Sequence, residues 1–366
     1  MNVTDTGARA AEAPRRSFLR RSIAHLEGPQ TMGSGGAFWV VIGLAVLAAA
    51  LYPAFADAWT VGNAAYFMVW TFMAMGLSLI WGYAGALSFG QTAFFGLAGY
   101  AYGVLTINIG SAYGFTIIAL LLSVGLAGIF ALVIGYFMFY GRISGVFVGI
   151  VTLSVTLVFE TFMAQTAGPQ WRIGSARLNG FNGMSGMPPL TIPWPGGELV
   201  LYPGPSLYYV LLALVVICYL GLRILLNSGF GNVLVAIREN PHRAEMLGYD
   251  IRLYQMLAFG LGGALAGLSG ALYTAWGQYI TPSSMGLTSA ALPIIWVAVG
   301  GRRDITATLF GTLLVLTVFQ TLTIYGSQYA LVAMGALLLV TVLVAPQGLV
   351  VLAMKGIGKL VGRGRS

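Results

Sequence analysis

Six of the 28 charged side chains of this sequence lie in residues 227–255, between long apolar runs. Such groups can form ion pairs and charge-assisted hydrogen bonds with a partner protein. Within this stretch, the sequence from Asn240 to Gly248 has the pattern of a short helix, with Asn240 as N-cap, Pro241 at the first position and Gly248 as a left-handed stop. A helix of two turns is not stable alone in water, so we expect it to dock on another structure. The charged residues of the stretch are Arg238, Glu239, Arg243, Glu245, Asp250 and Arg252.

Residues that could catalyse a reaction or bind a metal are few and scattered. His25 and His242 are the only histidines and Cys218 is the only cysteine, so the sequence offers no metal cluster, catalytic triad or internal disulfide built from them. It has no GxxxxGKS/T phosphate loop, so any ATP must be bound by another subunit. No basic patch is interleaved with aromatic residues, which argues against nucleic acid as a partner. We therefore predict no catalytic residue, no metal site and no cofactor bound by this chain.

Composition indicates a membrane protein. Of the 366 residues, 58% are hydrophobic and 8% are charged, and the mean hydropathy is +0.85, which leaves too little polar surface for a soluble domain. We predict an all-α, polytopic transmembrane bundle of about 8–10 membrane segments, because each crossing needs about 20 apolar residues. Two segments, 86–108 and 286–301, could cross fully or be re-entrant; the second is short and contains Pro293. The apolar segments are 37–56, 61–80, 86–108, 113–139, 144–166, 207–226, 256–281, 286–301, 304–325 and 328–352.

Basic residues predict how these segments are oriented. If the N-terminus is cytoplasmic, 16 of the 18 lysines and arginines fall on the cytoplasmic side, in agreement with the positive-inside rule. The C-terminus is then cytoplasmic as well. We expect a basic cytoplasmic tail at residues 1–36, a transmembrane domain at 37–354 with an outside loop at 167–206 and a cytoplasmic loop at 227–255, and a second basic tail at 355–366.

A polar stretch among the apolar segments is a candidate for a solute path. Residues 81–92 combine glycines with hydroxyl and amide side chains, and such backbone at membrane depth is tolerated where it is buried in protein or lines a water-filled path. The alternative is that these groups hydrogen-bond neighbouring helices. The only carboxylate within a predicted span is a further candidate, although it lies near enough to the outer end to reach the membrane interface. The candidate path residues are Tyr83, Ser88, Gln91, Thr92 and Glu160.

Several short strings occur in a fixed order over most of the chain. They are Gly82-Tyr83-Ala84-Gly85 with Ser88-Phe89-Gly90-Gln91, Gly229-Phe230-Gly231, Ala236 to Pro241 with Arg243-Ala244 and Leu247-Gly248-Tyr249, Gly267 to Tyr273, Trp296 to Arg302, and Pro346-Gln347-Gly348. With these strings, the chain resembles the permease subunits of branched-chain amino acid ABC importers, including the related urea and amide branch. The ordered set is specific, whereas each glycine-rich string alone is not.

The resemblance implies an importer of several subunits in a bacterial cytoplasmic (inner) membrane. The partners would be a second permease of similar fold, two cytoplasmic ATPases that hold ATP and Mg, a periplasmic or lipid-anchored binding protein, and membrane lipid. The helix at 240–248 would then be the coupling helix. Its Ala244 and Leu247 lie at i and i+3, which predicts one face suited to a groove on the ATPase, with charged residues at the rim. The expected coupling residues are Arg238, Glu239, Asn240, Pro241, Arg243, Ala244, Leu247 and Gly248.

The transported solute is less constrained by the sequence. We expect branched-chain or other hydrophobic amino acids, with urea or short-chain amides as the alternative. The string from Trp296 to Arg302 resembles the urea and amide branch, but Arg303-Asp304 follows where small residues are common in the family. A third hypothesis, from another class of protein, is a secondary carrier or channel that works without an ATPase. Binding of an ATPase through the 240–248 helix would distinguish the importer from the carrier.

Overall fold

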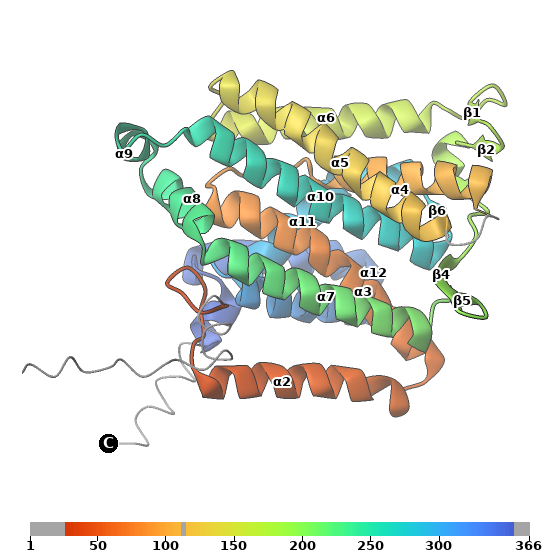
Figure 1. The fold of residues 1–366 in the computed structure, drawn as a ribbon, viewed down its shortest axis with the longest axis horizontal. Coiled ribbons are helices and arrows are strands. Elements are labelled where there is room, and N and C mark those ends of the chain that lie inside the picture. Colours follow the sequence, from red (N-terminus) through yellow and green to blue (C-terminus); the bar gives the residue numbers. More distant parts are fainter. Residues whose placement is uncertain (1–25, 111–114, 355–366) are drawn as a thin grey trace, which may run out of the picture.

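Long apolar helices run alongside one another through most of the chain (Figure 1). The computed structural model describes residues 26–110 and 115–354, so most of the two predicted basic tails, residues 1–25 and 355–366, lies outside the described residues. Within the described part, eight helices are long and apolar enough to cross a membrane. The helices that include these spans are α2 (Gly36–Leu51), α3 (Ala58–Leu77), α4 (Gln91–Ile109), α5 (Phe115–Tyr140), α6 (Val146–Ala164), α7 (Pro205–Leu226), α10 (Ile251–Gly277) and α12 (Ile305–Val344).

The two segments that could cross fully or be re-entrant, 86–108 and 286–301, differ in the structure. Helix α4 begins only at Gln91, after a non-helical stretch, yet is long enough to count among the eight. Helix α11 (Leu287–Gly300) has 14 residues, which span about 21 Å, less than the roughly 30 Å of a bilayer core. It follows a short helical turn, η4 (Pro282–Met285), which is buried against α4 and α6. The helical bundle is confirmed, with α11 too short to cross alone.

Two helices, α3 and α12, depart from regular α-helical geometry. The α3 helix continues as a π-helix, η2 (Ser78–Tyr83), and a 3-10 turn, η1 (Tyr52–Ala54), follows α2. Helix α12 bends at Gly326, where the backbone leaves helical geometry, and its second arm returns toward its start. Val351, beyond that arm, reaches Gly301 at the turn before α12. The described N- and C-terminal ends therefore lie at the same end of the bundle, as the topology predicts.

Helix α10 lies at the centre and packs against α3, α4 and α5 (Figure 1). Close approach is possible because α10 is rich in glycine and alanine. A Cβ on Gly263 would lie 2.2 Å from Cβ of Ala131, and one on Gly267 would lie 2.5 Å from Cβ of Ala127, both on α5. This GxxxG pair therefore allows two helix backbones to approach each other in the core.

The predicted outside loop contains short strands rather than a bare connection. Strand β1 (Arg172–Ile173) pairs with β2 (Ala176–Arg177), and β4 (Leu190–Trp194) pairs with β5 (Gly197–Leu201), both antiparallel. A 3-10 turn, η3 (Gly180–Asn182), precedes β3 (Met184–Ser185). Strand β3 pairs with β6 (Tyr279–Ile280), the connection between α10 and η4. The loop is thereby attached to the outer end of the central helices.

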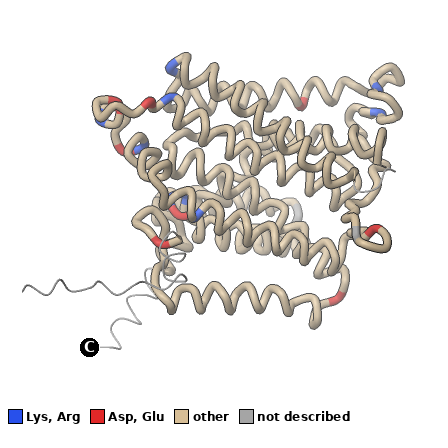
Figure 2. The backbone as a smooth tube through the Cα atoms, viewed as in Figure 1, with Lys and Arg blue, Asp and Glu red and all other residues tan. Residues whose placement is uncertain are grey.

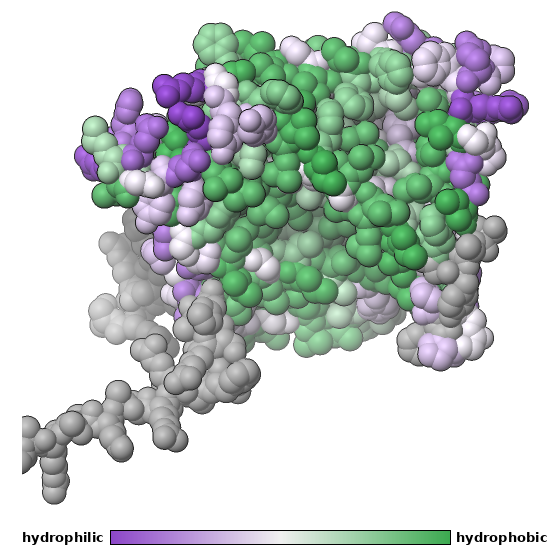
Figure 3. Space-filling view, turned by 45° about the horizontal axis from the view of Figure 1, so that its top comes forward, coloured by the Kyte–Doolittle hydropathy of each residue, from purple (hydrophilic) through white to green (hydrophobic). Residues whose placement is uncertain are grey.

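Charge and hydropathy divide the molecule into an apolar belt and two polar ends. Figure 3 shows a broad hydrophobic surface between polar ends, as expected for a chain whose sides contact lipid. Most of the charged residues that the structure describes lie at the end of the bundle where α8 and α9 are (Figures 1 and 2). We call this the inner end. Of the nine described arginines, only Arg172 and Arg177 lie at the opposite, outer end; the inner ones are Arg142, Arg223, Arg238, Arg243, Arg252, Arg302 and Arg303.

Candidate functional site

A short capped helix projects at the inner end. Helix α9 (Pro241–Met246) starts after Asn240, whose side-chain oxygen accepts a hydrogen bond from the Arg243 backbone N–H at 2.9 Å. It stops at Gly248, whose φ of 89° lies in the left-handed region and which donates to the Glu245 carbonyl at 2.9 Å. The predicted helix, with its N-cap, first-position proline and glycine stop, is confirmed.

The outward face of α9 differs from the prediction. Ala244 is buried against Val233 and Ile237 of α8 (Gly229–Glu239), so it attaches α9 to its own chain and does not face a partner. Met246 and Leu247 are 87% and 72% exposed. The prediction that Ala244 and Leu247 together face a partner's groove is wrong, because α8 covers the Ala244 side of α9. The exposed apolar pair is Met246 and Leu247.

Arg238, at the end of α8, also points inward. Its Nη1 donates to the Gly82 carbonyl of η2 at 2.5 Å, and its Nε and Nη2 donate to Glu239 Oε1 at 3.0 and 2.7 Å. Arg238 is therefore held by contacts within its own chain, with 16% of its side chain exposed, and its role at the rim of an ATPase groove stays a prediction. Glu239 itself is exposed, and its hydrogen bonds from Arg238 and the positive charges of Arg238 and Arg303 hold its pKa below the ordinary value of 4.5.

A third segment completes this contact. The turn between α11 and α12 packs on Gly82 so closely that a Cβ there would lie 1.6 Å from the Arg302 carbonyl oxygen. Nη1 of Arg303 lies 3.8 Å from Oε1 of Glu239. We call Gly82, Arg238, Glu239, Arg302 and Arg303 the inner node. Through it, α9 and α8 are connected to the end of α3 and to the α11–α12 turn, so strings far apart in the sequence meet at one place.

The part of the N-terminal tail that is described is packed against the inner end. Residues 26–35, which we call the strap, surround the fully buried Arg223 of α7. The guanidinium of Arg223 donates to the carbonyls of Leu26, Met32 and Gly33. The described end of the predicted basic tail is therefore packed against the bundle. An arginine just inside the inner end of an apolar run was the signal that could have indicated such a contact.

Other inner-end residues hold the strap as well. Asp304 caps α12 by accepting from the Ala307 N–H at 2.8 Å, and its second oxygen accepts from the Met32 N–H. Burial raises the pKa of the Asp304 carboxyl above its ordinary value. Tyr83, predicted to line a path, donates from its hydroxyl to the Gln30 carbonyl at 3.0 Å. Tyr83 thus anchors the strap at the inner end.

The other candidate path residues are buried where α4 begins or lie near the outer end. Ser88 accepts a hydrogen bond from the Gly90 N–H at 3.1 Å. Gln91 and Thr92 are also buried, and their side-chain polar atoms have no hydrogen-bond partner among the described residues. Glu160 lies against the start of α11, where a Cβ on Gly286 would be 2.9 Å from its Oε1. The partial positive charge at the N-terminus of α11 favours a carboxylate at this position. Their role in a path stays a prediction.

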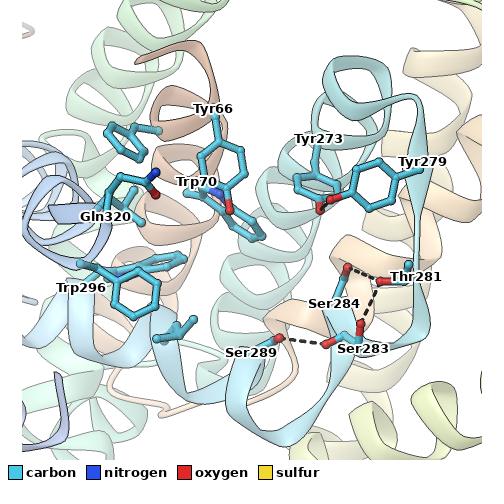
Figure 4. Close-up of a pocket in the computed structure, with 14 residues that line it drawn as sticks. Tyr66, Trp70, Tyr273, Tyr279, Thr281, Ser283, Ser284, Ser289, Trp296 and Gln320 are labelled. Carbon is cyan, nitrogen blue, oxygen red and sulfur yellow. Dashed lines mark hydrogen bonds between the residues drawn. The ribbon is translucent and has the colours of Figure 1, made fainter. Parts of the chain in front are cut away.

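A cavity of about 300 Å³ lies toward the outer end between α3, α10, η4, α11 and α12 (Figure 4). None of the five candidate path residues lines it. Aromatic rings form much of one side, and hydroxyl groups from η4 and its neighbours form another. The aromatic residues include Tyr66, Phe67, Trp70, Tyr273, Tyr279, Trp296 and Phe319, and the polar ones are Thr281, Ser283, Ser284, Ser289 and Gln320.

Comparison with known proteins identifies the family of this chain. The family model described as branched-chain amino acid transport system / permease component matches residues 59–342. The chain belongs to this permease family. It is 25% identical over 328 residues to the high-affinity branched-chain amino acid transport system permease protein LivM of Escherichia coli (strain K12), covering 84% of this chain and 74% of that protein. No solved structure matches the chain.

Further relatives of this permease carry two different names. LivM of Salmonella typhimurium is 23% identical over 91% of this chain and 81% of its own length. A probable branched-chain amino acid transport permease protein LivH of Methanocaldococcus jannaschii is 30% identical over 42% of this chain and 50% of its own length. Membership in the family and eight apolar helices make the chain a multi-pass membrane permease.

Proposed function

We propose that this permease is the transmembrane subunit of an ATP-driven importer that brings branched-chain amino acids across a bacterial cytoplasmic membrane. The observation that carries the proposal is α9, a capped helix that exposes Met246 and Leu247 at the basic end of the bundle. Exposed apolar side chains on a rigid helix suit a groove on a partner protein. The family match and the names of its relatives support the solute class.

The ATPase is the partner proposed for this helix. Energy must come from a subunit that binds ATP with Mg, since this chain has no phosphate loop of the common type. One of two such subunits, on the inner side, would bind Met246 and Leu247, with Arg243 at the rim. Closure of the ATPases would displace α9, and the buried contact of Ala244 would pass the motion to α8.

A second permease of similar fold completes the proposed translocation unit. Proteins named LivM and LivH in one organism, Methanocaldococcus jannaschii, both match this chain, which supports a pair of homologous permeases. Broad apolar surface on α12, including Val332, Leu339 and Leu343, is available for lipid or for that partner. A periplasmic or lipid-anchored binding protein would deliver the solute at the outer end.

The test is substitution of the exposed leucine on α9. We expect Leu247→Asp to leave membrane insertion unchanged but to abolish co-purification of the ATPase and ATP-dependent leucine uptake in proteoliposomes, because a charge in an apolar groove is costly to desolvate. Leu199→Asp is the matched control, because Leu199 is 48% exposed in the outer loop. Full uptake by the purified chain alone would instead show a carrier that needs no ATPase.

A further inference from the structure

We propose that the aromatic cavity near the outer end is a resting site for a zwitterionic amino acid on its way through this permease. The inference rests on the proposed function for the class of solute, and on the structure for its location. Tyr66 and Trp70 of α3 pack against Tyr273 of α10 and, with Trp296 of α11, line one side of the cavity (Figure 4). Tyr273 and Trp296 belong to the strings that carry the family resemblance, whereas Tyr66 and Trp70 lie outside them.

The aromatic side of the cavity suits both an ammonium group and a branched apolar side chain. Tyr66 and Trp70 have ring centroids 5.8 Å apart, Trp70 and Trp296 5.6 Å, and Tyr66 and Tyr273 6.2 Å. Ring faces attract a cation through their quadrupole and offer large apolar contact area. A group with a positive amine next to an aliphatic chain satisfies both properties of this wall.

The opposite side of the cavity suits a carboxylate. Hydroxyls of Thr281, Ser283 and Ser284 form a small network, with Thr281 Oγ1 at 2.9 Å from Ser283 Oγ and 3.3 Å from Ser284 Oγ. Ser289 donates to the Ser283 carbonyl at 2.9 Å (Figure 4). A hydroxyl can donate as well as accept, so these groups can turn from one another toward a negatively charged oxygen. Gln320 of α12 lies away from these hydroxyls, on the side of Trp70 and Trp296, and adds an amide donor there (Figure 4).

The absence of charge among the lining residues restricts the classes of ligand that the cavity can bind. Every one of the 14 residues that line the cavity is uncharged. A solute with a net charge would lose its hydration without gaining an opposite charge, which is costly, whereas a zwitterion brings its own compensation. A volume of about 300 Å³ is at the lower end for small-molecule sites. It accommodates an amino acid, and urea would leave most of it unfilled.

The stacked pair of Trp70, which lines the cavity, and Phe95, which lies behind it, is called the aromatic floor here and indicates the direction in which the solute would leave. Phe95 of α4 is stacked on Trp70 with ring centroids 5.0 Å apart and planes 10° from parallel. One helical turn before Phe95 on the same face lies Gln91, whose buried amide has no hydrogen-bond partner among the described residues. An unsatisfied buried amide is rare and requires an explanation. A passing polar solute, received when the aromatic floor opens, supplies one.

Filling the cavity tests the proposal. We expect Ser284→Trp to reduce leucine uptake by about tenfold or more, because a bulky ring removes the space for a ligand. ATP hydrolysis stimulated by the binding protein is expected to remain near the wild-type rate, since Ser284 is far from the inner node. Both are measured on the complete importer in proteoliposomes with radiolabelled leucine. Ser154→Trp is the matched control, because Ser154 is exposed on α6 outside the cavity.

A smaller change keeps the inference testable if the bulky variant does not assemble. Gln320→Leu preserves size and removes one hydrogen-bonding group, so we expect the KM for leucine to rise about fivefold with little change in ATP hydrolysis. Leucine uptake by both cavity variants at the rate of Ser154→Trp would overturn the cavity assignment and leave the proposed function intact. Failure of the wild-type importer to transport leucine would overturn the proposed function, and the zwitterion assignment with it.

Discussion

Replacing Arg238 distinguishes a role in stabilising the permease from a role in binding the ATPase, which the sequence alone could not do. We predict that Arg238→Met destabilises the permease even without its ATPase, because the buried Gly82 carbonyl loses its charged donor at 2.5 Å. A hydrogen bond to a charged group contributes about 1.5–3 kcal/mol. The ion pair with exposed Glu239 adds little, since water screens it. Methionine preserves the length of the apolar stem, so lost packing is a minor part of the effect.

The measurement is thermal unfolding of the purified permease in detergent, alone and in the complete importer. At roughly 2 °C for each kcal/mol, the Tm of the permease alone is expected to fall by about 3–6 °C. In the complete importer, ATP hydrolysis is expected to continue while leucine uptake is lost, because α8 no longer transmits motion to α3. Both results follow from the contact of Arg238 with η2.

Arg243 provides the control, because its side chain is exposed on α9 and has no hydrogen-bond or ion-pair partner among the described residues. Arg243→Met should leave the Tm of the permease alone unchanged and weaken only the binding of the ATPase. The reasoning is refuted if Arg238→Met leaves that Tm unchanged and instead weakens ATPase binding, because Arg238 would then act at the partner interface.

Three further substitutions test the inner end. Arg223→Met should leave three strap carbonyls without their donor and lower the free energy of unfolding by about 3–5 kcal/mol. The strap should then be cleaved quickly in limited proteolysis, and slow cleavage would contradict this prediction. Asn240→Ala removes the α9 N-cap, worth about 1 kcal/mol, so ATPase affinity measured by titration should fall about fivefold. Gly82→Ala should lower the Tm strongly because a Cβ would meet the Arg302 carbonyl, whereas Gly43→Ala, with open space around it, should not.

Local patterns in the sequence predicted the elements well. Apolar run lengths gave the bundle, and Asn240, Pro241 and Gly248 gave α9, because capping and turn conformations depend on neighbouring residues. The side of α9 that is exposed was predicted wrongly for a different reason. Spacing of i and i+3 predicts which residues share a side of a helix, but not which side another helix covers, and α8 covers Ala244.

Contacts between distant segments could not be predicted in this way. The strap depends on Arg223, nearly 200 residues away, and nothing in residues 26–35 by themselves shows that their carbonyls are bound. The aromatic cavity was missed because Tyr66 and Trp70 look like ordinary residues of apolar helices, and Tyr273 and Trp296 stand out only as members of separate family strings. A further signal was the polar run Thr281-Pro282-Ser283-Ser284 between two apolar segments.

The inner node and the aromatic cavity are built on the same two helical segments. The α3 segment and its continuation η2 carry Trp70 at the cavity and Gly82 at the node, 12 residues or about 18 Å apart along a helix. The α11 segment carries Trp296, with Arg302 six residues further on. Because packed helices move as rigid elements, displacement at the node must tilt or shift both cavity walls together. Loss of Arg238 would release only one of the two walls from α8, which explains why hydrolysis can persist while the solute stays in place.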